Sequence, residues 1–189
     1  MFTVRFANPS DIDFILAAFD STLPFLQSLG NEGQWGTTPF SQQEGFIDEV
    51  HKEVARSENF HANGTRERFL ALVAERELTA DAEINPAKQF IRTGEGIRYL
   101  AAGATYIRDD EAPPYFATKV PTVDAELKAA KEQGYVYMDV LLGYQEAPAQ
   151  YRKGAGVALL DRVKQYAKEK NKASIYLEIW VNNENGLLR

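Results

Sequence analysis

The residues best placed to do chemistry form a turn, Arg152-Lys153-Gly154-Ala155-Gly156, that leads directly into an amphipathic helix. The first amides of a helix have no partner inside it, and the aligned peptide dipoles put partial positive charge there. Two glycines remove the Cβ atoms that would keep a ligand from the backbone, and Arg152 and Lys153 add positive charge. The turn therefore predicts phosphate binding, although the same pattern also occurs as ordinary helix-entry chemistry.

Neither common phosphate loop is present. The sequence contains no G-x-x-x-x-G-K-[ST], which excludes a Walker loop. Gly154 and Gly156 open a helix after a strand, but no third glycine follows at the offset that a dinucleotide-binding turn requires. Such a turn would also follow the first strand of its fold, whereas this strand comes late in the chain.

Composition excludes several classes of protein. The net charge of −6 argues against a nucleic-acid surface, which would need a basic stripe. The chain has no cysteine, which excludes disulfides, thiolate zinc sites and a cysteine nucleophile. His51 and His61 alone do not make a metal site, and we expect both on a helix surface. The start of the chain lacks a signal-peptide pattern and no apolar run approaches membrane length, so we expect a cytosolic or nuclear protein.

The 189 residues are expected to form one domain that spans the chain. Apolar or alternating runs predict strands, and apolar residues at intervals of three and four predict helices. The expected strands are 2–6, 69–74, 97–107, 135–142 and 174–181. The expected helices begin near Pro9, at a capping box formed by Ser41 and Glu44, at 124, and just after Gly156, and the last one uses Val157, Leu160, Val163 and Ala167 as its buried face. Segments 21–38, 75–95 and 109–121 are expected to be irregular, and Trp35 either walls a substrate site or plugs the core.

The order of elements, the Lys153-Gly154-Ala155-Gly156 turn and the closing Val181-Asn182-Asn183-x-x-Gly186 resemble the GNAT superfamily of acyl-CoA-dependent N-acetyltransferases. The resemblance implies an α+β fold with a mixed, mostly antiparallel sheet, splayed at its middle and covered by helices on both faces. It places acetyl-CoA in the splay. The pyrophosphate would lie on the amides of Arg152, Lys153, Gly154, Ala155 and Gly156, and the pantetheine arm along Val140, Leu141 and Leu142, with Asn183 nearby.

The resemblance also implies direct acetyl transfer to a primary amine, without a metal. A carboxylate would deprotonate the ammonium, and Asp139 and Glu178 are the two candidates. The other interpretation is that each of them faces solvent or pairs with a cation. The negative charge of the protein favours a cationic amine substrate.

The sequence departs from the family pattern at two points. Tyr151 stands where the family has Gln or Arg, which leaves an amide cradle unaffected. The family continues past a residue equivalent to Gly186 into a helix with a tyrosine and a last hairpin, and that tyrosine would follow Arg189. The sequence therefore predicts a shortened domain, with two alternatives to an active enzyme: a silent CoA-binding protein, or another phosphate-ligand binder. Strand 174–181 would then be an open edge, which predicts either a homodimer of this chain or a natural protein that continues past Arg189.

Overall fold

A single sheet organises the chain. The computed structural model describes residues 1–64, 68–85 and 89–178. In these residues the strand order is β1-β2-β4-β5-β6, with β3 paired to β4, and every pair is antiparallel except β5–β6. The strands are β1 (Phe2–Phe6), β2 (Phe69–Leu78), β3 (Ile91–Gly94), β4 (Ile97–Asp109), β5 (Tyr135–Gly143) and β6 (Ser174–Leu177).

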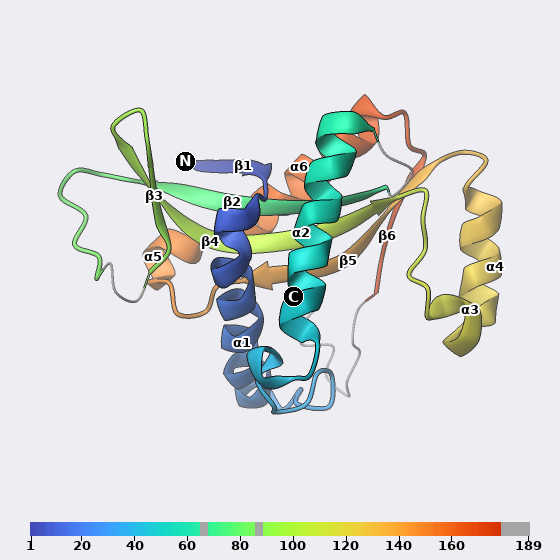
Figure 1. The fold of residues 1–189 in the computed structure, drawn as a ribbon, viewed down its shortest axis with the longest axis horizontal. Helices are drawn as coiled ribbons and strands as arrows, with labels where there is room; N and C mark the ends of the chain where they lie inside the picture. Colours follow the sequence, from blue (N-terminus) through green and yellow to red (C-terminus); the bar gives the residue numbers. More distant parts are fainter. Residues whose placement is uncertain (65–67, 86–88, 179–189) are drawn as a thin grey trace.

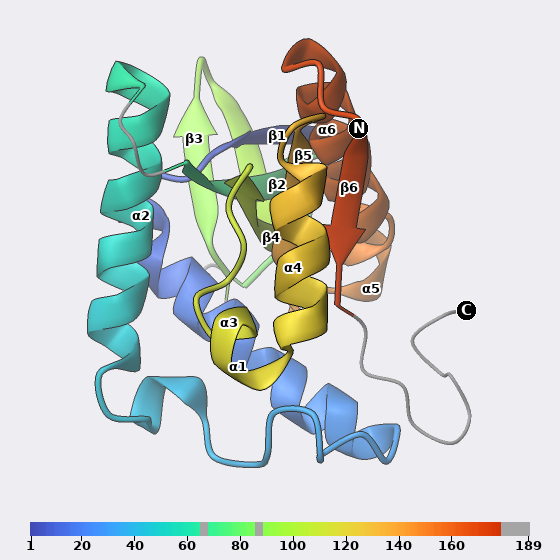
Figure 2. The ribbon, with the colours of Figure 1, turned by 90° about the vertical axis from the view of Figure 1, so that its right-hand side faces the viewer.

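Helices cover both faces of this sheet. They are α1 (Ile12–Ser28), α2 (Phe46–Asn63), α3 (Phe116–Lys119), α4 (Pro121–Ala130), α5 (Ala149–Arg152) and α6 (Ala155–Glu169), with short 3-10 turns η1 (Pro9–Asp11) and η2 (Phe40–Gln42). Helices α1 and α2 cross one face (Figure 1). Helix α6 lies on the opposite face from α2 (Figure 2). The predicted mixed, mostly antiparallel α+β fold is confirmed.

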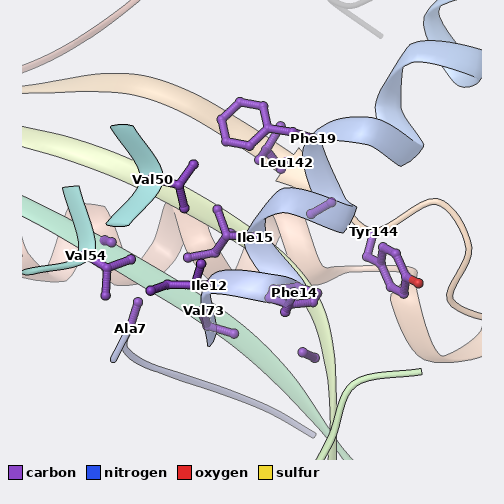
Figure 3. Packing of buried hydrophobic residues seen from close by; sticks show 14 of the residues in the cluster. Ala7, Ile12, Phe14, Ile15, Phe19, Val50, Val54, Val73, Leu142 and Tyr144 are labelled. Atoms are coloured by element: carbon purple, nitrogen blue, oxygen red, sulfur yellow. The ribbon is translucent and has the colours of Figure 1, made fainter. Parts of the chain in front are cut away.

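Each face of the sheet has its own apolar core. Side chains of α1 and α2 pack on one face against alternate residues of the strands (Figure 3). They include Phe14, Ile15, Val50 and Val54, over Val73 and Leu142. On the other face, Leu159 and Val163 of α6 pack on Leu72 and Met138. Alternation along a strand sends neighbouring residues to opposite faces, so β2 and β4 are buried on both sides.

The buried face of α6 differs from the predicted one. Val157 is 64% exposed, whereas Ala155, Leu159 and Val163 are buried. Gly154, at φ 96°, turns the chain so that the helix begins at Ala155. Val157 then lies roughly 200° around the helix from Ala155, which directs it to solvent. Of the predicted face, Val163 and Ala167 are buried as expected.

Helix α1 continues through much of the segment 21–38 that was predicted to be irregular. It runs to Ser28 with Pro24 inside it. Leu23 and Leu26 are both buried and extend the apolar face of the helix past the proline. Burial of these side chains therefore outweighs the backbone hydrogen bond that Pro24 cannot make.

The predicted capping box at Ser41 and Glu44 is wrong. The amide and hydroxyl of Ser41 both donate to the carboxylate of Asp20, on α1. Helix α2 begins four residues later than the box requires, after Gly45 in the left-handed region at φ 78°. Ser41 thus binds the segment before α2 to α1, and Gly45 precedes the first residue of α2.

The segment 75–95, predicted to be a loop, holds the end of β2 and the whole of β3. Glu75 lies in the sheet and is 1% exposed. Two arginines make its burial possible: Arg5 contacts Oε1 at 2.6 Å and Arg92 contacts Oε2 at 2.7 Å. The predicted strand stopped before Glu75 because this residue is charged. In the structure β2 continues through Glu75, because a carboxylate with two guanidinium partners can be buried in a strand.

Gly103 lies at a bulge and at a close approach of two backbones. The register between β2 and β4 shifts beside it, from Ala74 opposite Gly103 to Glu75 opposite Ala101. A Cβ atom at Gly103 would lie 2.7 Å from the carbonyl oxygen of Leu142, on β5. Only glycine therefore lets β4 and β5 approach each other here without a shift of the backbone.

Helix α2 is attached to the sheet by one buried hydroxyl, which provides a test of the packing. Ser57 Oγ, fully buried, accepts a hydrogen bond from the amide of Ala71 at 2.8 Å. Ser57→Ala leaves that amide unpaired, and the free energy of unfolding is expected to fall by about 1–3 kcal/mol. Urea unfolding measures the loss. The control Ser28→Ala, at an exposed serine, should change stability by less than about 0.5 kcal/mol, and equal losses would contradict the assignment.

Candidate functional site

The site forms where β5 departs from regular pairing. Val140 lies opposite Tyr106 and Met138 lies opposite Ile107, so Asp139 is an extra residue in β5. Such a bulge reverses the alternation of the residues that follow it. Tyr137 and Asp139 therefore face the same side as Val140, and Leu141 is left 43% exposed on the other side.

The second half of β5 has a free edge in the described part of the chain. The parallel pairing with β6 covers Tyr135 to Met138 and ends at the Met138–Leu177 pair. No strand among the described residues pairs with 139–143 on that side. Among the described residues, backbone groups of β5 after Met138 therefore remain available to a ligand, and the splay of the sheet stays a prediction.

One cavity, of about 470 Å³, lies beside this free edge. It is lined by Leu141, Leu142, Gly143, Gln145, Ala149, Arg152, Lys153, Ala155 and Gly156. The fold thus brings the predicted strand residues and the predicted glycine turn to one place. Gly154 is held beside them by its left-handed backbone, with the ring of Phe2 3.4 Å from where a Cβ would be. At Gly156 a Cβ would meet nothing closer than Leu141 Cδ2, at 3.9 Å, so the turn is open toward the cavity.

A second cavity, of about 310 Å³, lies between β5 and α2. Its charged lining residues are Glu49, Glu53, Arg108 and Asp139, and its aromatic ones are Phe19, Trp35, Phe40, Phe46, Tyr106, Tyr115 and Tyr137. Val140 also lines it, so β5 contributes to both cavities. Trp35 packs against the core and also lines this cavity, so the core role is confirmed and a role as a substrate wall stays a prediction.

Charged side chains of alternating sign connect Asp139 to Glu53. Arg108 Nε contacts the two oxygens of Asp139 at 2.9 and 2.7 Å. Arg108 also lies 3.6 Å from Glu111, which Arg56 contacts at 2.9 Å. Arg56 in turn lies 3.9 Å from Glu53 Oε1. The arginine contact of Glu53, at 3.9 Å, is longer than that of Asp139, at 2.7 Å, so the two carboxylates of this cavity have different surroundings.

Both of these carboxylates have a raised pKa. Burial raises the pKa of Asp139 to about 6 although Arg108 opposes the change. Burial raises the pKa of Glu53 to about 7, again against Arg108 and then Arg56, and the charge of Asp139 adds to the rise. Two acidic groups that change protonation near neutral pH in one cavity are typical of a site for proton transfer.

Sequence reasoning missed Glu53. It lies on α2 between Glu49 and Arg56, in a charged run that is typical of a solvent-exposed helix face. The one available signal is helical spacing, since Glu53 neighbours the buried Val50 and Val54. That spacing does not distinguish a carboxylate at the edge of a core from one that lines a cavity.

Glu178, the other predicted candidate, is separate from Asp139. It lies after the end of β6, is exposed, and lines neither cavity. Its Oε2 accepts a hydrogen bond from the hydroxyl of Tyr115 at 2.7 Å. Burial and this hydrogen bond raise the pKa of the Tyr115 phenol. Glu178 thus contacts the second cavity only through Tyr115, and Asn183 lies outside the described residues.

Comparisons with known proteins bear on the fold. No family model matches the sequence, and no curated protein matches it. The folded chain is similar to an N-acetyltransferase from Staphylococcus aureus Mu50, with a TM-score of 0.53, 15% identity, and coverage of 100% of this chain and 79% of that one. The chain therefore shares the fold of this acetyltransferase, which agrees with the fold that the sequence predicted. A transcriptional regulator from Bacillus halodurans C-125 is also similar, with a TM-score of 0.52, 11% identity, and coverage of 100% and 88%.

At such low identity the likeness establishes the fold alone, and the chemistry must be argued from the site. Within residues 1–64, 68–85 and 89–178, no cluster of three His, Cys, Asp or Glu side chains could hold a metal ion. No helix in the same ranges is long and apolar enough to cross a bilayer.

The contact between Arg108 and Asp139 can be tested through its pH dependence. Arg108→Met leaves a buried carboxylate without its partner, and the free energy of unfolding at pH 8 is expected to fall by about 3–5 kcal/mol. The loss should be much smaller at pH 5. Because the folded pKa of Asp139 is already about 6 and rises further without Arg108, the carboxyl is then mostly neutral.

Denaturant unfolding of wild type and variant at the two pH values measures this difference. The double variant Arg108→Met/Asp139→Asn should recover much of the stability at pH 8, because no charge is left unpaired. Equal losses at pH 5 and pH 8 would show that Arg108 acts by packing alone.

Proposed function

We propose that this protein is an N-acetyltransferase that moves an acetyl group from acetyl-CoA to a primary amine. The observation that carries the proposal is the position of the two cavities. They lie on either side of β5 after Met138, where no described strand pairs with its edge. One lies beside a cationic glycine turn, and the other is lined with carboxylates and aromatic rings. A phosphate-bearing donor and a cationic acceptor would therefore meet at this strand.

The first cavity suits the cosubstrate. The pyrophosphate would lie on the amides of Arg152 to Gly156, at the positive end of α6. The pantetheine arm would follow the backbone of Val140, Leu141 and Leu142, whose edge lacks a strand partner among the described residues. When bound, acetyl-CoA supplies the thioester carbonyl that the amine attacks. Amides of the same strand would stabilise the developing negative charge on that carbonyl oxygen.

The second cavity suits the amine. Among the described lining residues, Glu49, Glu53 and Asp139 outnumber the one cation, Arg108, so the cavity attracts an ammonium group. The aromatic wall favours an acceptor with an apolar body, and ring faces stabilise a nearby cation. An alkylammonium has a pKa of about 10.4 and must lose a proton before it attacks, so the raised pKa values of the carboxylates fit this role.

The function is tested in two steps. Calorimetry measures whether acetyl-CoA binds, and release of free CoA thiol then follows transfer to a panel of primary amines. We expect binding and transfer, with apolar monoamines preferred over amino sugars. Binding without transfer to any amine would support the alternative of a silent CoA-binding protein. Absence of binding would overturn the proposal.

The phosphate cradle predicts a specific effect of Gly156→Val. A branched side chain there would occupy the space beside the amides, and affinity for CoA is expected to fall about 10-fold or more, equivalent to about 1.4 kcal/mol. The fold should persist because the nearest atom to a new Cβ is 3.9 Å away. Calorimetry gives the affinity and circular dichroism the fold.

The control for this variant is Ala125→Val, at an exposed position of α4. It introduces the same β-branched side chain into a helix away from both cavities, and CoA affinity should not change. Wild-type affinity in Gly156→Val would contradict the assignment of the turn to phosphate.

A further inference from the structure

Glu53 presents a buried carboxylate oxygen that nothing in the described structure satisfies. Its Oε2 is shielded from solvent and has no hydrogen-bond partner among the described residues. The other oxygen, Oε1, has only the distant contact with Arg56 at 3.9 Å. Buried polar atoms are nearly always hydrogen-bonded, so this oxygen on a cavity wall can accept a hydrogen bond from water or from a ligand group that enters the cavity.

A second unsatisfied atom lies in the same cavity. The hydroxyl of Tyr106 is buried and has no hydrogen-bond partner among the described residues. Tyr106 is on β4 and Glu53 on α2, and both line the cavity that Asp139 closes on its β5 side. Two unsatisfied polar atoms from different elements therefore point to a polar group of a ligand bound here, and a primary ammonium can donate to both.

Asp139 offers no such free group. Both of its oxygens lie within hydrogen-bond distance of Arg108 Nε, at 2.9 and 2.7 Å. A guanidinium stabilises the ionised form of the carboxylate that it contacts, so Arg108 makes Asp139 a weaker proton acceptor. The bulge at Asp139 thus positions Arg108 and shapes the cavity wall.

We propose that Glu53, and not Asp139, accepts the proton from the attacking amine. This inference rests on the proposed acetyl transfer. The ammonium gives one proton to Glu53, which becomes a neutral carboxylic acid, and the freed nitrogen lone pair forms the bond to the thioester carbon. When the carbon–sulfur bond breaks, the thiolate takes the second proton of the nitrogen. Glu53 then releases its proton to water.

The charged and titratable groups around Glu53 set its pKa, and therefore the pH range in which it can accept a proton. They come from α2, β4, the segment after β4, and β5: Glu49, Arg56, Tyr106, Arg108, Glu111, Tyr115, Tyr137 and Asp139. Burial and the charge of Asp139 raise the pKa of Glu53 to about 7, while Arg108 and Arg56 limit the rise. A base with a pKa near the operating pH combines availability with proton affinity.

The test compares Glu53→Gln, Asp139→Asn and the control Glu58→Gln, an equal charge change at an exposed site on α2. The probes are acetyl-CoA with 2-phenylethylamine, tyramine and 1,4-diaminobutane. In the wild type, kcat should rise with pH around 7. Glu53→Gln should lower kcat by about 10²–10⁴-fold and abolish this rise, with KM for acetyl-CoA unchanged. Asp139→Asn should lower kcat by less than about 10-fold and keep the rise, and Glu58→Gln should match the wild type.

Each other outcome overturns the inference. Wild-type kcat in Glu53→Gln would show that Glu53 takes no part, and loss of the pH dependence in Asp139→Asn alone would assign the proton to Asp139. If the wild type transfers acetyl to none of the three amines, the proposed function itself fails and the role of Glu53 falls with it.

A stability measurement shows whether Glu53→Gln loses activity through misfolding. The folded pKa of about 7 lies above the usual 4.5, so ionisation of Glu53 costs stability as pH rises through that window. Glu53→Gln removes this cost, and its melting temperature should exceed that of the wild type at pH 8 and match it at pH 4. A lower melting temperature at pH 8 would show that Glu53 is a structural partner and would overturn the proposal.

Discussion

The edge of β5 after Met138, which has no strand partner among the described residues, is the constraint on which the site depends. Backbone groups of a strand need partners, and the pairing of β5 with β6 ends at Met138, just before the extra residue Asp139. The bulge at that point turns Val140 toward α2 and Leu141 toward α6. One irregularity of one strand therefore separates two cavities and exposes the backbone between them. A ligand that pairs with this edge would complete the sheet.

The two apolar cores hold the walls of the cavities at a fixed separation. Helix α6 packs on one face of the sheet and starts at Gly154, which fixes the cationic turn beside β5. Helix α2 packs on the other face through Val50 and Val54, and Glu53 lies between these two anchors. Burial of a poorly paired carboxylate lowers stability, and the apolar packing around Glu53 offsets this loss. We interpret this loss of stability as the physical origin of the reactivity proposed for Glu53.

Parts of the fold with short-range causes were predictable. The local sequence is enough to predict the strand around Val136 and Met138 and the glycine turn before α6. The errors arose where a distant residue changes the local balance. Glu75 ended a predicted strand because its partners, Arg5 and Arg92, are remote in sequence. Ser41 resembled a helix cap because Asp20, its partner, lies in another helix.

The sequence by itself determined the strand-to-helix turn at Gly154 and Gly156, the mixed fold and the strand that carries Asp139, because these follow from local backbone freedom and side-chain periodicity. Only the tertiary structure decided which carboxylate is available. Arg108 occupies Asp139 across the sheet, whereas Glu53 meets the same cavity with an unsatisfied oxygen. Burial and partner geometry set the protonation of a carboxyl group, and both arise only when elements far apart in the chain are packed together.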